Sequence, residues 1–210
     1  MKYKVMIVED QTMPRELFEL RIQASEHFEV ALSIDNAALA DVYCLRFPVD
    51  LILMDVVTRN GESGLDAAKR IKRTFPQIKI IIVTSMPECS YLSRAREIGV
   101  ESFWYKEEQR ESLLDVMERT MAGESVYPDA TPELQLGLAS SYKFTDRELE
   151  VLREMTGGDT NQEIAERLHM SVATVKTHIL NMLEKTGFRN RTELAVRARE
   201  SGLVILNRRD

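Results

Sequence analysis

The chain has 210 residues, of which 30% are charged and 44% hydrophobic, a balance typical of a globular protein rather than a disordered one. Its apolar runs are all shorter than the ~18 residues of a membrane span. The first residues also lack the long apolar stretch of a signal peptide, so we expect a cytoplasmic protein with no membrane partner. Cys44 and Cys89 are the only cysteines, and two such residues supply no disulfide framework.

Charge is distributed unevenly along the chain. The net charge is −6, yet residues 171–210 carry eight basic and four acidic side chains and are therefore positive. An acidic protein with a basic end predicts contact with an acidic partner at one place only, which favours a local nucleic-acid contact. An ordinary solvated basic face has the same composition, so charge alone leaves both interpretations open.

Five short apolar runs alternate with helical patterns in the first part of the chain. The runs span residues 5–8, 30–32, 51–54, 80–83 and 102–105. Three of them are continuous rather than alternating, which indicates strands covered on both faces. The helical patterns span residues 13–24, 37–46, 91–98 and 113–121. This alternation predicts a doubly wound α/β fold with five parallel strands and right-handed crossovers.

Chemically active side chains follow the ends of four predicted strands. They are Glu9 and Asp10 after the first run, Asp55 after the third, Thr84 and Ser85 at the end of the fourth, and Lys106 after the fifth. Because the carboxyl ends of parallel strands share one edge, these groups should meet there. Carboxylates so close together repel each other, and an oxygen-only ligand set of this kind suits Mg²⁺. The sequence thus predicts a metal-dependent acidic site with one fixed ammonium.

These residues, together with Phe103 three positions before Lys106, resemble the receiver domain of bacterial response regulators. The resemblance implies strand order 2-1-3-4-5 and a protein that is a regulator rather than an enzyme. It implies that Asp55 accepts a phosphoryl group from a sensor histidine kinase. Mg²⁺ would be held by Glu9, Asp10, Asp55 and the carbonyl of Val57. Thr84, Ser85 and Lys106 would bind the phosphoryl oxygens, and Phe103 would be the rotating aromatic of the switch.

One departure from the receiver pattern lies after Asp55. The loop at residues 56–64 is one residue longer than usual and lacks a Met-Pro pair, so the position of the Val57 carbonyl is open and Arg59 could reach over the site. Two alternatives follow. An atypical receiver would regulate DNA binding without phosphorylation. A phosphoester hydrolase with Asp55 as nucleophile would need a second aspartate where Val57 stands.

The second half of the chain reads as an all-α domain. Pro128 and Pro132 mark residues 123–143 as a linker, with one short helix expected at 131–139. Thr145 and Thr160 open capping boxes, Ser171 caps a third helix that ends near Gly187, and a fourth helix runs from about residue 192 to 202. We therefore divide the chain into residues 1–122, the linker, and an all-α four-helix domain at 144–210.

The third of these helices has one apolar stripe and an opposite face of short hydrogen-bonding side chains. Such a face fits a helix in the major groove of DNA, although an ordinary bundle helix would also be amphipathic. The motifs at residues 144–152, 161–165, 171–178 and 185–187 resemble the LuxR-type helix-turn-helix, and with the receiver they resemble the NarL/FixJ subfamily of response regulators.

The resemblance implies binding to double-stranded promoter DNA as a homodimer, with RNA polymerase as a further candidate partner. The candidate DNA-binding residues are Thr174, Lys176, Thr177, His178, Leu180, Asn181, Lys185 and Arg191. Leu180, where many relatives carry a polar or basic residue, would touch a thymine methyl or pack inward. The candidate dimerisation residues are Ala195, Val196, Ala198, Arg199 and Leu203.

Overall fold

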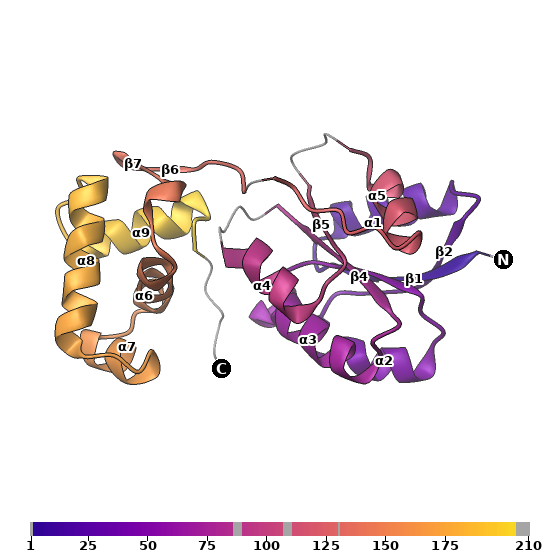
Figure 1. Ribbon diagram of the computed structural model, residues 1–210, viewed down its shortest axis with the longest axis horizontal. Helices are drawn as coiled ribbons and strands as arrows, with labels where there is room; N and C mark the ends of the chain where they lie inside the picture. Colours follow the sequence, from indigo (N-terminus) through magenta and orange to yellow (C-terminus); the bar gives the residue numbers. More distant parts are fainter. Residues whose placement is uncertain (1, 86–89, 107–110, 130, 205–210) are drawn as a thin grey trace. The chain divides into compact units, whose positions relative to one another are not determined.

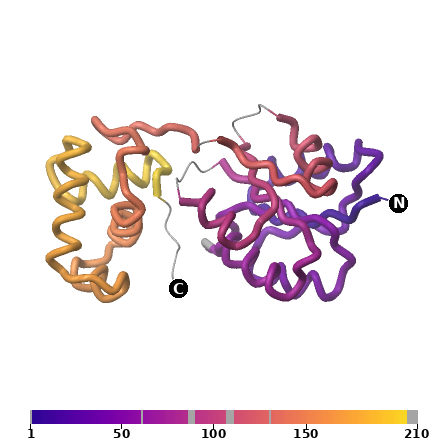
Figure 2. The backbone as a smooth tube through the Cα atoms, in the orientation of Figure 1, coloured from indigo at the N-terminus to yellow at the C-terminus, as the bar shows by residue number. Residues whose placement is uncertain are grey.

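The computed structural model describes residues 2–85, 90–106, 111–129 and 131–204. Residues 2–85 and 91–129 make up the first compact unit, and residues 131–204 the second (Figures 1 and 2). Within these ranges, no helix is both long enough and apolar enough to cross a membrane.

The first unit is the predicted α/β fold. Its sheet has five parallel strands in the order β2-β1-β3-β4-β5, which confirms the expected topology. The strands are β1 (Tyr3–Val8), β2 (Phe28–Ile34), β3 (Leu51–Met54), β4 (Lys79–Thr84) and β5 (Ser102–Tyr105). The helices are α1 (Thr12–Gln23), α2 (Ala40–Arg46), α3 (Gly64–Thr74), α4 (Ser90–Ile98) and α5 (Leu113–Met121), with short 3₁₀ turns η1 (Ala37–Leu39) and η2 (Arg59–Gly61).

Helices cover both faces of this sheet. The α1 and α5 helices lie on one face, and α2, α3 and α4 lie on the other (Figure 1). The continuous apolar runs are explained by this arrangement, because every residue of β3 is buried and a strand between two helical layers needs apolar side chains on both sides. Large side chains such as Phe18 and Ile22 complete the α1 side of the core, where each contributes about 1.5–3 kcal/mol.

The chain after α5 continues along the open edge of β5 instead of leaving the unit. The Phe103 amide donates to the Val126 carbonyl over 2.8 Å, and the Val126 amide donates to the Ser102 hydroxyl over 3.1 Å. The Tyr127 hydroxyl donates to the Val100 carbonyl over 2.8 Å. The expected linker therefore begins later than predicted, since residues 124–127 complete the first unit and protect an otherwise bare sheet edge.

The second unit begins with a hairpin where the sequence predicted a short helix. Residues 131–139 form no helix; β6 (Gln135–Leu136) pairs antiparallel with β7 (Ala139–Ser140) instead. Gly137 stands in the turn with a φ of +62°, and a Cβ there would lie 2.2 Å from the Thr186 carbonyl. The close approach of this glycine to another helix, a long-range effect, explains the wrong prediction.

Four helices follow the hairpin and a 3₁₀ turn, η3 (Ser141–Lys143), and they confirm the predicted all-α domain. They are α6 (Asp146–Thr156), α7 (Asn161–Arg167), α8 (Val172–Thr186) and α9 (Arg191–Ser201). Thr145 and Thr160 form complete capping boxes, and Gly187 ends α8 in the left-handed conformation, as expected. Leu136 and Ala139 of the hairpin belong to the core of these helices, so this unit starts before residue 144.

Candidate acidic site and nucleic-acid interface

Three carboxylates meet at the carboxyl end of the central strands. Glu9 and Asp10 follow β1, and Asp55 follows β3, its neighbour in the sheet. One carboxylate oxygen from each lies within 4.8 Å of the others. Glu9 is completely buried and Asp55 is 5% exposed, whereas Asp10 is the more accessible member. The predicted gathering of these residues is therefore confirmed.

Lys106, which follows β5, supplies the ammonium that partly neutralises the site. Its Nζ donates to Glu9 Oε2 over 2.5 Å and to Asp55 Oδ2 over 2.8 Å. Among the residues that the structure describes, Asp10 makes no hydrogen bond or ion pair. The oxygen-only donor set with one uncompensated carboxylate fits a hard cation such as Mg²⁺.

Burial changes the proton affinity of two of these acids. Loss of water around Glu9, with the charge of Asp55 beside it, raises the pKa of Glu9 to about 7 despite the opposing effect of Lys106. Burial also raises the pKa of Asp55, while Lys106 and the Val56 amide act in the opposite direction. Lys106 has a raised pKa, because the two carboxylates outweigh its own desolvation, and it stays charged at neutral pH.

The long loop after Asp55 is folded back on itself and is bonded to the segment that follows β2. Thr58 is buried, and its hydroxyl accepts the Ala37 amide and donates to the Glu62 carbonyl. A Cβ on Gly64 would lie 1.8 Å from the Asp55 carbonyl, so only glycine allows α3 to start there. Arg59 does not reach over the site, because its guanidinium pairs with Asp35.

The remaining predicted site residues lie at the ends of β4 and β5. Thr84 is buried, Ser85 is exposed, and the Lys106 amide donates to the Thr84 carbonyl over 2.9 Å. Phe103 is buried, with ring centroids 5.0 Å from Tyr105 and 6.2 Å from Tyr127. Val57 is half-buried and forms a bridge with Ser63.

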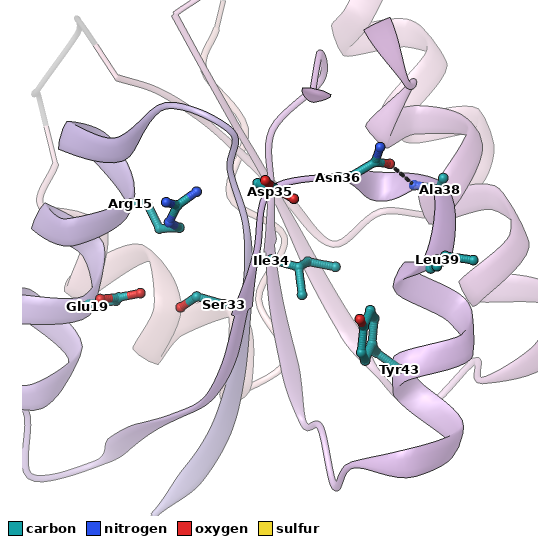
Figure 3. A pocket seen from close by; sticks show the side chains of 9 residues that line it. All are labelled: Arg15, Glu19, Ser33, Ile34, Asp35, Asn36, Ala38, Leu39 and Tyr43. Carbon is teal, nitrogen blue, oxygen red and sulfur yellow. Dashed lines mark hydrogen bonds between the residues drawn. The ribbon is translucent and has the colours of Figure 1, made fainter. Parts of the chain in front are cut away.

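Arg15 is a residue near the acidic site that the sequence did not reveal. Its Nη1 donates to the Glu9 carbonyl over 2.8 Å and so supports the turn that carries Glu9 and Asp10. Arg15 also lines an open pocket of about 560 Å³ between α1 and the end of β2, shared with Asp35 and Tyr43 (Figure 3). Six residues separate it from Glu9, a spacing that carries no specific signal.

The outer face of α8 is solvent-exposed along its length. Thr174, Lys176, Thr177, Leu180 and Asn181 are all exposed, and His178 is half-buried. Leu180 is 60% exposed, so of the two expected alternatives packing inward is wrong. The opposite stripe of α8 is buried as predicted, because its apolar residues join the core of the unit.

Two side chains that were predicted to contact DNA phosphates already have partners within the second unit. The Lys185 ammonium donates to both Glu148 oxygens, over 2.7 and 2.6 Å, and to the Lys143 carbonyl. Arg191 donates to the Asn161 side chain and the Asp159 carbonyl. Both cations join helices within the unit, and reaching a phosphate would cost these bonds.

The predicted dimerisation residues divide into a buried and an exposed group. Ala198 and Leu203 are fully buried in the core of the unit, and Ala195 packs against it. A partner cannot reach Ala198 or Leu203 in this structure. Val196, 49% exposed, and Arg199 are the members of the set that a second chain can reach.

Both units of the chain match known protein families. Residues 5–118 match the response regulator receiver domain, and residues 142–198 match the bacterial regulatory proteins of the LuxR family. The response regulator protein VraR of Staphylococcus aureus strain Mu3 is 31% identical over 212 residues, covering 97% of this chain and all of the relative. The chain belongs to the response regulators with a LuxR-type DNA-binding domain. VraR of Staphylococcus epidermidis strain RP62A is similar at 32% identity, with the same coverage.

Solved structures share the fold of this response regulator. A structure of RcsB dimers bound to two parallel DNAs has a TM-score of 0.62 at 19% identity and covers 94% of this chain and 98% of its own. RcsB from Salmonella enterica serovar Typhimurium, bound to a promoter with the phosphomimetic BeF₃⁻, has a TM-score of 0.61 at 20% identity. It covers 97% of this chain and 100% of its own. The family is one of transcription regulators and is not an enzyme class.

Proposed function

We propose that this response regulator is switched by phosphorylation of Asp55 by a sensor histidine kinase and that the switch controls dimerisation and promoter binding. The observation that carries this proposal is the acidic site: three carboxylates with one lysine bonded to two of them, at the carboxyl edge of a receiver sheet. An Asp55 oxygen would form a bond to phosphorus while the bond from phosphorus to the kinase histidine breaks.

The residues around Asp55 fit this transfer. Glu9, Asp10, Asp55 and the Val57 carbonyl would hold Mg²⁺, which spreads the negative charge of the transferring group. Lys106 would keep the Asp55 oxygen in place and then follow the new phosphoryl oxygens. Thr84 and Ser85, at the end of β4, would donate hydrogen bonds to the phosphoryl group.

The energies of such contacts suit a two-state switch. Phosphorylation adds roughly −1.5 to −2 charge units. Charge-assisted hydrogen bonds contribute about 1.5–3 kcal/mol each, and moving an equilibrium from 1:99 to 99:1 needs ~5.5 kcal/mol. Two or three bonds formed only in the active state would contribute about 3–9 kcal/mol in total, which is of the size that the switch requires. Phe103, which is buried beside Tyr127, would rotate when Asp55 is phosphorylated and so alter the surface at the edge of β5.

DNA binding would use the exposed face of α8, with Lys176, Thr177 and Asn181 on the bases or the backbone. RcsB, whose fold this chain shares, is bound to DNA in both of these structures and as dimers in the first, which supports DNA binding and a dimer on DNA. Val196 and Arg199 on α9 would contribute to pairing. Two half-sites on one duplex would then raise affinity through effective concentration. RNA polymerase as a partner rests on the sequence resemblance.

A mass measurement tests the phosphorylation step. The full chain is incubated with Mg²⁺ and acetyl phosphate, and its intact mass is recorded. We expect an added phosphoryl mass that is lost in Asp55→Asn and kept in Asp129→Asn, a matched aspartate on the surface of the same unit. An unmodified wild-type chain that still binds DNA would instead favour the receiver that works without phosphorylation.

A further inference from the structure

The outer face of α8 carries an exposed apolar strip. At about 100° per residue, Ala173, Thr177 and Leu180 lie within about 60° of one another on the outer face of the helix. All three are exposed, and Leu180 is 60% exposed. Leu180 therefore offers an apolar contact on the face that is assigned to DNA, with small side chains on the same strip of the helix.

The hydroxyl groups on this face are largely committed to the helix itself. The Thr177 hydroxyl donates to the Ala173 carbonyl over 3.0 Å. The Thr174 hydroxyl is paired with the Ser171 hydroxyl over 2.7 Å at the start of the helix. With its only proton turned to the backbone, Thr177 presents a methyl group and an acceptor lone pair to a ligand.

The carboxyl-terminal end of α8 has no free cation for a DNA phosphate among its described residues. Lys185 is held by Glu148, and Glu184 is exposed on the same side of the helix as Leu180. A negative carboxylate there repels phosphates. The exposed Lys176 lies one turn before Leu180, so the region that favours DNA is the first two-thirds of the helix, with Leu180 at its end.

We propose that α8 reads a thymine 5-methyl group in each half-site, with Leu180 as the specificity-determining residue for that base and Ala173 and Thr177 beside it. Thymine is the base that displays a methyl group in the major groove, and Ala and the methyl of Thr are side chains that contact it. This inference rests on the proposed DNA-binding function of α8 and adds the base class that it selects.

The test uses a duplex that the full-length, acetyl phosphate-treated chain selects from random-sequence DNA. Each thymine of that duplex is replaced in turn by deoxyuridine, which removes the 5-methyl group alone. For the wild type, we expect one or two positions in each half-site at which deoxyuridine weakens binding about fourfold, the effect of losing one buried methyl group.

The Leu180→Ala variant should bind the thymine duplex and the deoxyuridine duplex equally well at one of those positions. Truncation of a largely exposed side chain should leave the fold intact, as circular dichroism would verify. Leu138→Ala, which shortens another exposed leucine of the same unit, should keep the full deoxyuridine penalty. A Leu180→Asn chain put through the same selection should no longer prefer thymine there.

Two results would overturn the inference. One is a Leu180→Ala chain that keeps every deoxyuridine penalty of the wild type. The other is a wild-type chain for which no thymine methyl group matters although the selected duplex binds. A chain that selects no sequence at all would overturn the proposed DNA reading by α8 itself, and the two failures are therefore distinguishable.

Discussion

At the residue scale, Glu9 is the group whose chemistry depends most on its surroundings. It is fully buried, accepts a bond from Lys106 and another from the Gln11 amide, and still has a pKa of about 7. The protonated form is therefore populated in the folded, metal-free chain over a range where the unfolded chain has already lost the proton. Proton and metal compete for the same carboxylate.

This competition predicts an unusual pH dependence. Between pH 4.5 and 7 the folded Glu9 binds more protons than the unfolded one, so the free energy of unfolding of the metal-free chain should fall as pH rises. The loss should be on the order of 1–3 kcal/mol. Urea unfolding in EDTA at pH 5, 6 and 7.5 measures it, and Glu9→Gln should flatten the curve. With Mg²⁺ present the trend should weaken, because metal affinity rises as the proton leaves. An unfolding free energy that rises steadily over this range would contradict the raised pKa.

The sequence predicted which acids meet at the sheet edge, because strand ends are visible as the limits of apolar runs. It did not predict how they are held. Arg15 on the Glu9 carbonyl, and Gly64 against the Asp55 carbonyl, depend on distances between segments that no local pattern encodes. The same limit explains Lys185, which the resemblance assigned to a phosphate and the fold assigns to Glu148.

At the element scale, two helices of the second unit begin with the same capping box but have different surroundings. In α6, Glu148 is 2% exposed. Its carboxylate accepts a hydrogen bond from the Thr145 amide at the start of the helix and another from the Lys185 ammonium of α8. In α7, Glu163 accepts a hydrogen bond from the Thr160 amide at the surface and makes no ion pair with a neighbouring helix within the described part of the chain. Local spacing revealed both caps, whereas the bond that joins α6 to α8 depends on the tertiary fold.

The two glutamates therefore make a matched pair of substitutions. Burial opposes ionisation of Glu148, but bonds from Lys185 and Thr145 hold the pKa of that carboxyl below its usual range. Glu148→Gln should lower the stability of the second unit by about 1–3 kcal/mol above pH 5, and the difference should shrink as pH falls below about 4. Glu163→Gln should cost less. Hydrogen exchange of α6 and α8 in the full chain measures both. Equal losses would show that the Lys185 bond adds nothing to the cap.

At the scale of the whole molecule, the boundary between the units differs from the linker at residues 123–143 that the sequence composition predicted. Ser125, Val126 and Tyr127 are bonded to the edge of β5, and the Tyr127 ring lies under the Arg96 guanidinium at 4.5 Å. On the other side, Leu136 is buried among the helices of the second unit. Composition predicted a linker at residues 123–143, but residues 124–127 are bonded to the first unit, and residues 135–143 form a hairpin and a 3₁₀ turn of the second unit.

A pair of truncations tests this boundary. A chain ending at Asp129 should be more stable to urea than one ending at Ala122 by about 1–3 kcal/mol, because the shorter one loses the hydrogen bonds of residues 124–127 and exposes Phe103. Ser102→Ala in the longer chain should remove part of that difference. Identical unfolding midpoints would indicate that this segment contributes nothing to the sheet edge.

The segment along β5 has a consequence for anyone who recombines such regulators. A hybrid joined after residue 122 would remove from the first unit the segment that covers the edge of β5. A hybrid that resumes at residue 144 would remove Leu136 and Ala139 from the core of the second unit. A junction between Asp129 and Thr131 leaves both units intact. A hybrid joined there should keep both units folded, because the covering segment stays with the strand that it contacts.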